Sequence, residues 1–351
     1  MGVARGDAPV AAGVSPLATP VPDRSRHAHT NPKVYSVDEG IRTQRGDAAL
    51  RGSHFVQGVP LRLGGEGREG APMVSSPQSA GRERTIASGD VEIAVTEFPN
   101  PGRSPVVLLH GIGSRGQSWW PVIDPLAARF HLYQLDLRGH GASGKPSSGY
   151  LMEHYAADLD AALDALELQG EEPRIIGHSL GGLVALYWAS RRPTRAAALV
   201  VEDPSLRVPP DIVDAFDGWQ QLAALTPAQA AAWYRQEYPD WSDEDCLRRA
   251  ETITSTAPGV FAELRAEAED ALARGTTDRM HILSGVQSPT LLLYGSTELG
   301  GMVAPADAER FVQIMPRGRA IQIPGVGHSL HRDASDAFLE AVIPFLDGKG
   351  W

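Results

Sequence analysis

The segment 174–182, RIIGHSLGG, constrains the fold of this chain more than any other. An apolar run ends at Gly177, Ser179 follows between two glycines, and a helical pattern begins at Leu183. This is Gly-x-Ser-x-Gly between a strand and a helix, the pattern of a nucleophile elbow. Glycines are needed there because the turn is sharp and the serine backbone is strained. We expect the Ser179 hydroxyl at a helix N-terminus, where free amides favour negative charge, and His178 pointing away from it.

Short apolar runs alternate with helical patterns along the chain beyond residue 84. The runs lie at 106–109, 132–135, 174–176, 197–201, 290–294 and 320–323. A hairpin is expected before them, at 85–98, with its turn at 88–90. Strands that alternate with helices predict an α/β fold with a doubly wound, mostly parallel sheet.

Residues 1–83 differ from the rest in composition. Prolines interrupt their first part and glycines their later part, and apolar residues occur singly. Too little core can form to offset the entropy of ordering such a segment. We predict a disordered or low-complexity N-terminal extension at 1–83 and a folded domain at 84–351.

The segment from about 205 to 286 interrupts the alternation, because it shows helical patterns without a strand. Thr226, followed by a proline, and Ser242 are expected to begin helices, and Gly275 to end one. We predict a helical cap inserted between two strands. The cap is rich in tryptophan and tyrosine, and about half of these rings are expected to pack within it.

Composition limits the classes of partner and cofactor. The chain has 351 residues and a formal net charge of −11, which disfavours nucleic acids and anionic membrane surfaces. A single cysteine, Cys246, excludes an internal disulfide and fits a reducing compartment. No apolar run is long enough to span a bilayer, and no zinc-binding spacing occurs. We expect a cytoplasmic protein with a small-molecule substrate and no metal or organic cofactor.

A serine nucleophile needs a base, and a histidine base needs a carboxylate. Of the eleven histidines, His328 is the best placed, because it follows the last predicted strand in a glycine-containing loop. The acid is expected between serine and histidine in chain order. Glu298, after the strand at 290–294, is the first choice, and Asp203 and Glu202 remain alternatives.

An oxyanion hole is the remaining requirement for acyl chemistry. The loop 110–113, HGIG, follows the first buried strand. The backbone amide of Ile112 can there join that of Leu180, directly after the nucleophile.

With these pieces the chain resembles the α/β-hydrolase fold superfamily over residues 84–351. The resemblance rests on 110–113, 136–143, 177–181 and 327–328. It implies that Ser179 and His328 are nucleophile and base, and that Arg138 and His140 brace their own loop. Members usually carry aspartate where Glu298 stands. A serine nucleophile disfavours the dehalogenase and epoxide-hydrolase branches.

The predicted function is hydrolysis of a small, largely apolar carboxylic ester or lactone through an acyl-enzyme. Trp120, Trp219 and Trp233 are the candidate substrate-binding side chains. Carbon–carbon bond hydrolysis or cofactor-free peroxidation on the same triad is an alternative, because the fold hosts many chemistries. A ligand-sensing protein is another.

Overall fold

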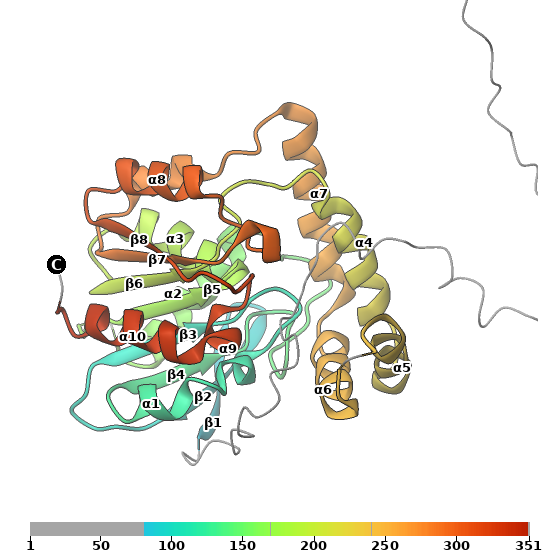
Figure 1. Cartoon of the computed structure of the whole chain (residues 1–351). Coiled ribbons are helices and arrows are strands. Elements are labelled where there is room, and N and C mark those ends of the chain that lie inside the picture. Colours follow the sequence, from blue (N-terminus) through green and yellow to red (C-terminus); the bar gives the residue numbers. More distant parts are fainter. Residues whose placement is uncertain (1–80, 169, 240, 350–351) are drawn as a thin grey trace, which may run out of the picture. The chain divides into compact units, whose positions relative to one another are not determined.

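The computed structural model describes residues 81–168, 170–239 and 241–349, which form an α/β fold around one sheet (Figure 1). Its eight strands follow the order β1-β2-β4-β3-β5-β6-β7-β8. They are β1 (Arg82–Ser88), β2 (Val91–Phe98), β3 (Pro105–Leu109), β4 (His131–Leu135), β5 (Arg174–His178), β6 (Ala198–Glu202), β7 (Thr290–Tyr294) and β8 (Gly318–Gln322). Strands β3 to β8 are parallel to one another, and the antiparallel pairs in the sheet are β1 with β2 and β2 with β4.

The hairpin begins at Arg82, two residues before the expected boundary of the folded domain. Its turn lies where the sequence predicts it, with Gly89 at a φ of 57°. Such a φ favours glycine because it has no Cβ. The rest of the expected extension, 1–80, lies outside the described residues.

Helices cover both faces of the sheet. They are α1 (Ile123–Ala127), α2 (Met152–Ala165), α3 (Leu180–Arg191), α8 (Pro305–Ile314), α9 (Leu330–Asp333) and α10 (Ser335–Leu346). All of β3 is buried, and its residues alternate between two cores. Val107 and Leu109 pack with α2 and α3, whereas Val106 and Leu108 pack with α1 and α10. This burial on both faces explains why β3 is apolar throughout.

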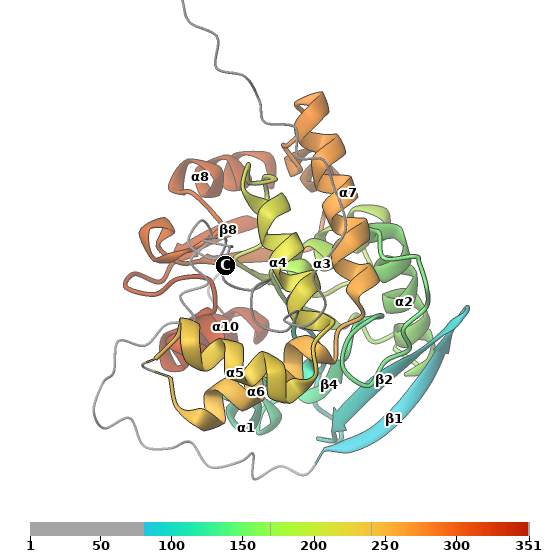
Figure 2. The same ribbon diagram turned by 90° about the vertical axis from the view of Figure 1, so that its right-hand side faces the viewer.

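The segment between β6 and β7 is helical, and we call its residues 205–286 the cap. It contains α4 (Ile212–Ala223), α5 (Pro227–Glu237), α6 (Asp243–Thr254), α7 (Pro258–Arg274) and the 3₁₀ turn η2 (Met280–Gly285). Figure 2 shows α4 beside α7 and α5 beside α6. The predicted helix-capping residues are in place. The Thr226 and Ser242 side chains accept hydrogen bonds from backbone amides at the starts of α5 and α6, and Gly275 ends α7 with a left-handed φ of 68°.

None of the helices in the described ranges is both long enough and apolar enough to cross a bilayer.

Candidate active site

Ser179 lies in a strained turn between β5 and α3. Its φ is 51° and its ψ is −112°, a conformation that side chains with a Cβ rarely adopt. A Cβ on Gly177 would lie 2.3 Å from the carbonyl oxygen of Gly181, and one on Gly181 would lie 2.3 Å from that of Leu109. Neither glycine can be replaced without moving the backbone. The Ser179 amide donates to the carbonyl of Glu202 at 2.8 Å, which ties the turn to β6.

His328 lies in the loop after β8, and its Nδ1 is 2.7 Å from Oδ2 of Asp203. Asp203 is fully buried directly after β6, and its carboxylate also accepts the amides of Met302 (2.7 Å) and Val303 (3.3 Å). A carboxylate can only accept, so Nδ1 carries the proton and donates it. This leaves Nε2 of His328 as an acceptor, the form that a general base requires.

The prediction that Glu298 pairs with the histidine is wrong. Glu298 is exposed in the 3₁₀ turn η3 (Thr297–Leu299), and no hydrogen bond or ion pair joins it to His328 within the described residues. The loop after β7 contributes its amides instead, from Met302 and Val303, to the carboxylate of Asp203. The carboxylate that pairs with His328 therefore comes from the end of β6, and Asp203 is one of the alternatives left open by the sequence.

Glu202, the other alternative, pairs with a histidine that sequence reasoning missed. The fully buried Glu202 carboxylate lies 2.9 and 2.8 Å from Nδ1 of His331 and accepts its amide at 2.9 Å. Consecutive residues at the end of β6 thus hold two histidines, three positions apart in sequence. That spacing was visible in the chain, but nothing in the sequence connects it to β6.

We expect His178 to point away from Ser179, but the structure places its ring at the site. Its ring centroid lies 4.6 Å from that of His328, and its Nε2 is 3.0 Å from the His328 carbonyl oxygen. Burial, and after it the neighbouring His328 and His331, hold the pKa of His178 well below its ordinary value. The neutral ring therefore donates Nε2–H to that carbonyl and anchors the loop that carries His328.

The loop 110–113 runs past the nucleophile. A Cβ on Gly111 would lie 2.8 Å from Nδ1 of His178 and 3.3 Å from the Ser179 Cβ, so only glycine fits without displacement. Leu180 is the first residue of α3, and its amide has no partner within that helix. No turn or loop hydrogen bond among the described residues uses the Ile112 amide. Both amides are thus free to bind an anion beside Ser179.

Two buried histidines, His110 and His140, fix the position of the loop 110–113. His110 accepts the Leu137 amide at Nε2 (2.9 Å), and His140 accepts the Gly113 amide at Nε2 (3.2 Å). Burial lowers the pKa of His110 to about 4 and that of His140 to about 3, so both rings are neutral acceptors. Arg138 forms a buried ion pair with Asp158, at 2.5 and 2.7 Å.

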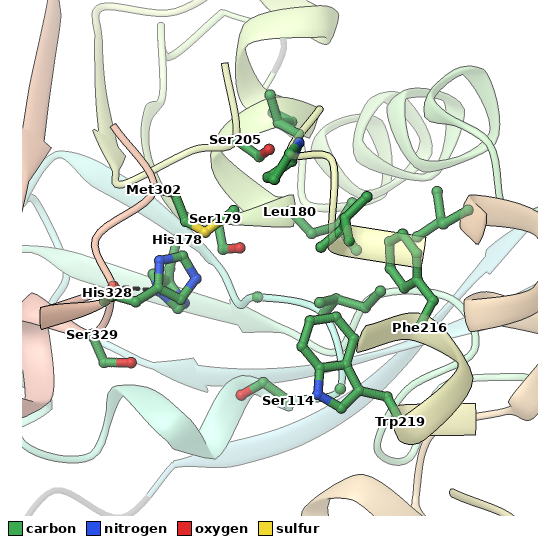
Figure 3. A pocket seen from close by; sticks show the side chains of 18 of the residues that line it. Ser114, His178, Ser179, Leu180, Ser205, Phe216, Trp219, Met302, His328 and Ser329 are labelled. Atoms are coloured by element: carbon green, nitrogen blue, oxygen red, sulfur yellow. Dashed lines mark hydrogen bonds between the residues drawn. The ribbon is translucent and has the colours of Figure 1, made fainter. Parts of the chain in front are cut away.

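A pocket of ≈ 120 Å³ opens at Ser179 and His328 (Figure 3). The cap supplies much of its apolar wall, with Ile212, Phe216 and Trp219 of α4 facing the core residues. In the described ranges no group of three or more potential ligand side chains is placed to hold a metal.

Of the three predicted substrate-binding tryptophans, only Trp219 lines this pocket. Trp233 packs edge-on against Tyr234 and Tyr238 and is not among the residues that line this pocket. Trp120 also lies off the pocket, with the Arg248 guanidinium 5.7 Å from its ring centre. The pocket has instead a polar part that the sequence did not predict, lined by Arg249, Arg279 and Arg332.

Comparison with known proteins agrees with this fold. The model of the alpha/beta hydrolase family matches residues 106–341. A 2-(acetamidomethylene)succinate hydrolase of Mesorhizobium japonicum is 26% identical over 75% of this chain and 95% of its own length. A pimeloyl-[acyl-carrier protein] methyl ester esterase of Chromobacterium violaceum is 28% identical over 70% of this chain and 96% of its own length.

A solved structure of E-2-(acetamidomethylene)succinate hydrolase superimposes with a TM-score of 0.64 at 22% identity. The match covers 76% of this chain and 99% of that one. At this identity the likeness establishes the fold alone. The family match, which extends over most of the described residues, carries the assignment: the chain belongs to the alpha/beta hydrolase family.

Proposed function

We propose that this protein is a serine hydrolase that cleaves a small carboxylic ester or lactone through an acyl-enzyme on Ser179. The observation that carries the proposal is the His328–Asp203 pair at 2.7 Å, in the pocket that also contains the serine. A buried carboxylate that fixes the histidine tautomer has a clear purpose where that histidine must accept a proton.

In the proposed mechanism, Ser179 Oγ attacks the substrate carbonyl while His328 Nε2 takes its proton. Asp203 keeps the proton on Nδ1 and stabilises the imidazolium that forms. The tetrahedral oxyanion accepts hydrogen bonds from the amides of Ile112 and Leu180, where each donor is worth about 10²–10³ in rate. His328 then protonates the leaving alcohol, and water activated by the same nitrogen releases the acid.

The pocket supports a substrate with a short, largely apolar portion. Phe216 and Trp219 of the cap, with Leu183 and Ile253, offer hydrocarbon surface opposite the nucleophile. Burying apolar area contributes about 25 cal/mol per Å² and needs no precise hydrogen bonding. A methyl ester esterase among the relatives is consistent with ester chemistry.

The proposal is tested by steady-state turnover of a panel of short aryl and alkyl esters, lactones and matching amides. We expect many turnovers per protein molecule on esters or lactones, and a loss of at least ~10³-fold in Ser179→Ala. Ser190→Ala is the matched control, because Ser190 lies on the same helix but bonds the Tyr187 carbonyl outside the pocket. Near-normal activity in Ser179→Ala, or binding of the panel without any turnover, would refute the proposal.

A further inference from the structure

Two arginines, one from the cap and one from the segment after His328, line the pocket. Arg249, on α6 of the cap, donates from Nη1 to the carbonyl of Gly113 at 3.0 Å, which places it at the oxyanion loop. Arg332, on α9, follows His328 by four residues. Both side chains are partly buried, so their charge belongs to the pocket rather than to the outer surface.

Within the part of the chain that the structure describes, neither guanidinium forms an ion pair with a carboxylate. Among the described residues no carboxylate oxygen lies within the 4.0 Å of an ion pair to Arg249 or Arg332, although many surface arginines have one. The third pocket arginine, Arg279, has Glu267 at 3.9 Å. Within the described residues, Nε of Arg249 is buried without a hydrogen-bond acceptor. The Arg249 side chain also contacts the Tyr234 hydroxyl, which is uncharged and does not neutralise the guanidinium.

Burial and several neighbouring charges act on Arg332, and Arg249 is one of those neighbours. Burial lowers the pKa of Arg332; among its neighbours Asp333 raises that pKa, Arg249 lowers it, and Asp245 and Glu202 raise it. Glu202 is already engaged with His331. Partly buried cations that repel each other and have no direct counter-ion are costly unless an anion joins them.

We propose that Arg249 and Arg332 bind a free carboxylate of the substrate, so that the enzyme acts on an ester or lactone that also carries a carboxylate. This rests on the proposed function, whose apolar wall then holds only the short hydrocarbon between the two ends. A planar guanidinium matches a carboxylate in shape and hydrogen-bond geometry.

Long-range attraction does not explain anion binding here, because the chain carries a formal net charge of −11. Selectivity for an anion must therefore come from the local arginines, and it should disappear when either one is removed. This makes the proposal sensitive to single substitutions.

The kinetic test compares monomethyl esters of dicarboxylic acids, from malonate to adipate, with the matching neutral dimethyl esters. The native protein should prefer the half-ester of at least one length by about 10-fold or more in kcat/KM. Arg249→Gln and Arg332→Gln should each lower that preference by about 10- to 100-fold, the range for one charge-assisted hydrogen bond, mainly through KM. Arg332→Lys keeps the positive charge but loses the planar guanidinium that can donate two parallel hydrogen bonds, so it should retain part of the half-ester preference.

Arg248→Gln is the matched control. It removes the same charge from the same helix one residue away, but Arg248 is exposed and paired with Glu244 at 2.6 Å. The half-ester preference should stay at the native value in this variant. Thermal unfolding of each protein shows whether the folded domain is intact.

A binding measurement separates this proposal from the proposed function. Calorimetric titration of Ser179→Ala with succinate, glutarate and adipate should detect binding that Arg332→Gln weakens about 10-fold or more. Such binding without ester turnover by the native protein would leave the carboxylate site standing and refute the hydrolase. Ser179-dependent turnover with no half-ester preference, or an equal preference in Arg248→Gln and Arg332→Gln, would overturn the carboxylate site alone.

Discussion

Replacing Asp203 with asparagine tests how the site prepares its base. Both Asp203 oxygens accept backbone amides, Oδ2 from Met302 and Oδ1 from Val303, and Oδ2 also accepts Nδ1 of His328. An asparagine has one oxygen to accept the loop amides and an NH₂ group that can only donate. With that NH₂ facing His328, the proton moves to Nε2, and the histidine can no longer accept a proton from Ser179.

The expected loss follows from this tautomer change. A wrong tautomer in the same arrangement of serine, histidine and carboxylate costs about 10⁴ in kcat, or about 5 kcal/mol of transition-state stabilisation. We therefore expect Asp203→Asn to lose about 10⁴-fold in kcat on an activated ester, with KM changed far less. Glu298→Gln is the control, and because Glu298 is exposed we expect its kcat within about 3-fold of native.

The assay is steady-state kinetics on one short aryl ester, with thermal unfolding measured for each variant. A folded Asp203→Asn with native kcat, or a larger loss in Glu298→Gln than in Asp203→Asn, would refute this reasoning. Loss of folding in Asp203→Asn is addressed by Asp203→Glu, which keeps the acceptor and should regain part of the activity if the carboxylate acts through His328.

Three further predictions follow from burial and position. Trp219→Ala should weaken kcat/KM for a bulky ester more than for a short one, whereas Trp233→Ala should lower thermal stability and leave their ratio unchanged; equal effects would remove Trp219 from the substrate site. Since the folded pKa values of His110 and His140 lie below 6.5, the unfolded state takes up protons first. Unfolding free energy should therefore fall between about pH 6.5 and 4, by on the order of 3 kcal/mol for His110, and a flat denaturant midpoint over that window would contradict this. Deleting residues 1–80 should leave ester turnover unchanged, and an inactive, folded remainder would show that the extension contributes to the site.

The nucleophile elbow could be predicted from the sequence because its requirements are local. Gly177 and Gly181 flank Ser179 within one turn, and a Cβ on Gly177 would meet the backbone of Gly181 itself. The buried strands were predictable for a similar reason, since burial on both faces forces every residue of β3 to be apolar. Short-range constraints of this kind leave a visible pattern in the chain.

The carboxylate that pairs with His328 could not be identified from the sequence, because its surroundings come from segments that are distant in the chain. Asp203 and Glu298 both follow strands that end at the same edge of the sheet. What separates them is a φ of 45° at Asp203 and two amides supplied by residues about 100 positions away, and neither leaves a sequence signal. The amides of Met302 and Val303 are backbone groups that any residue would provide.

The tryptophans of the cap likewise could not be sorted from the sequence into pocket-lining and packing residues. Trp219 and Trp233 are both partly buried and lie on neighbouring helices, so composition does not distinguish them. Helix packing decides: α4 carries Trp219 into the pocket beside α7, whereas α5 pairs with α6 and stacks Trp233 into an aromatic cluster. The sequence did not predict the pocket arginines, because Arg249 and Arg332 belong to distant segments of the chain that come together only in the folded protein.

Trapping the acyl-enzyme tests the central claim most directly. The native protein is mixed with an activated short ester, quenched in acid within the first turnover, digested and analysed by mass spectrometry. A covalent acyl group on the peptide that contains Ser179, absent from Ser179→Ala and accumulating before product release, is the predicted result. Hydrolysis by Ser179→Ala at the rate of the native protein would contradict the account. An acyl group on a residue other than Ser179 would contradict it as well.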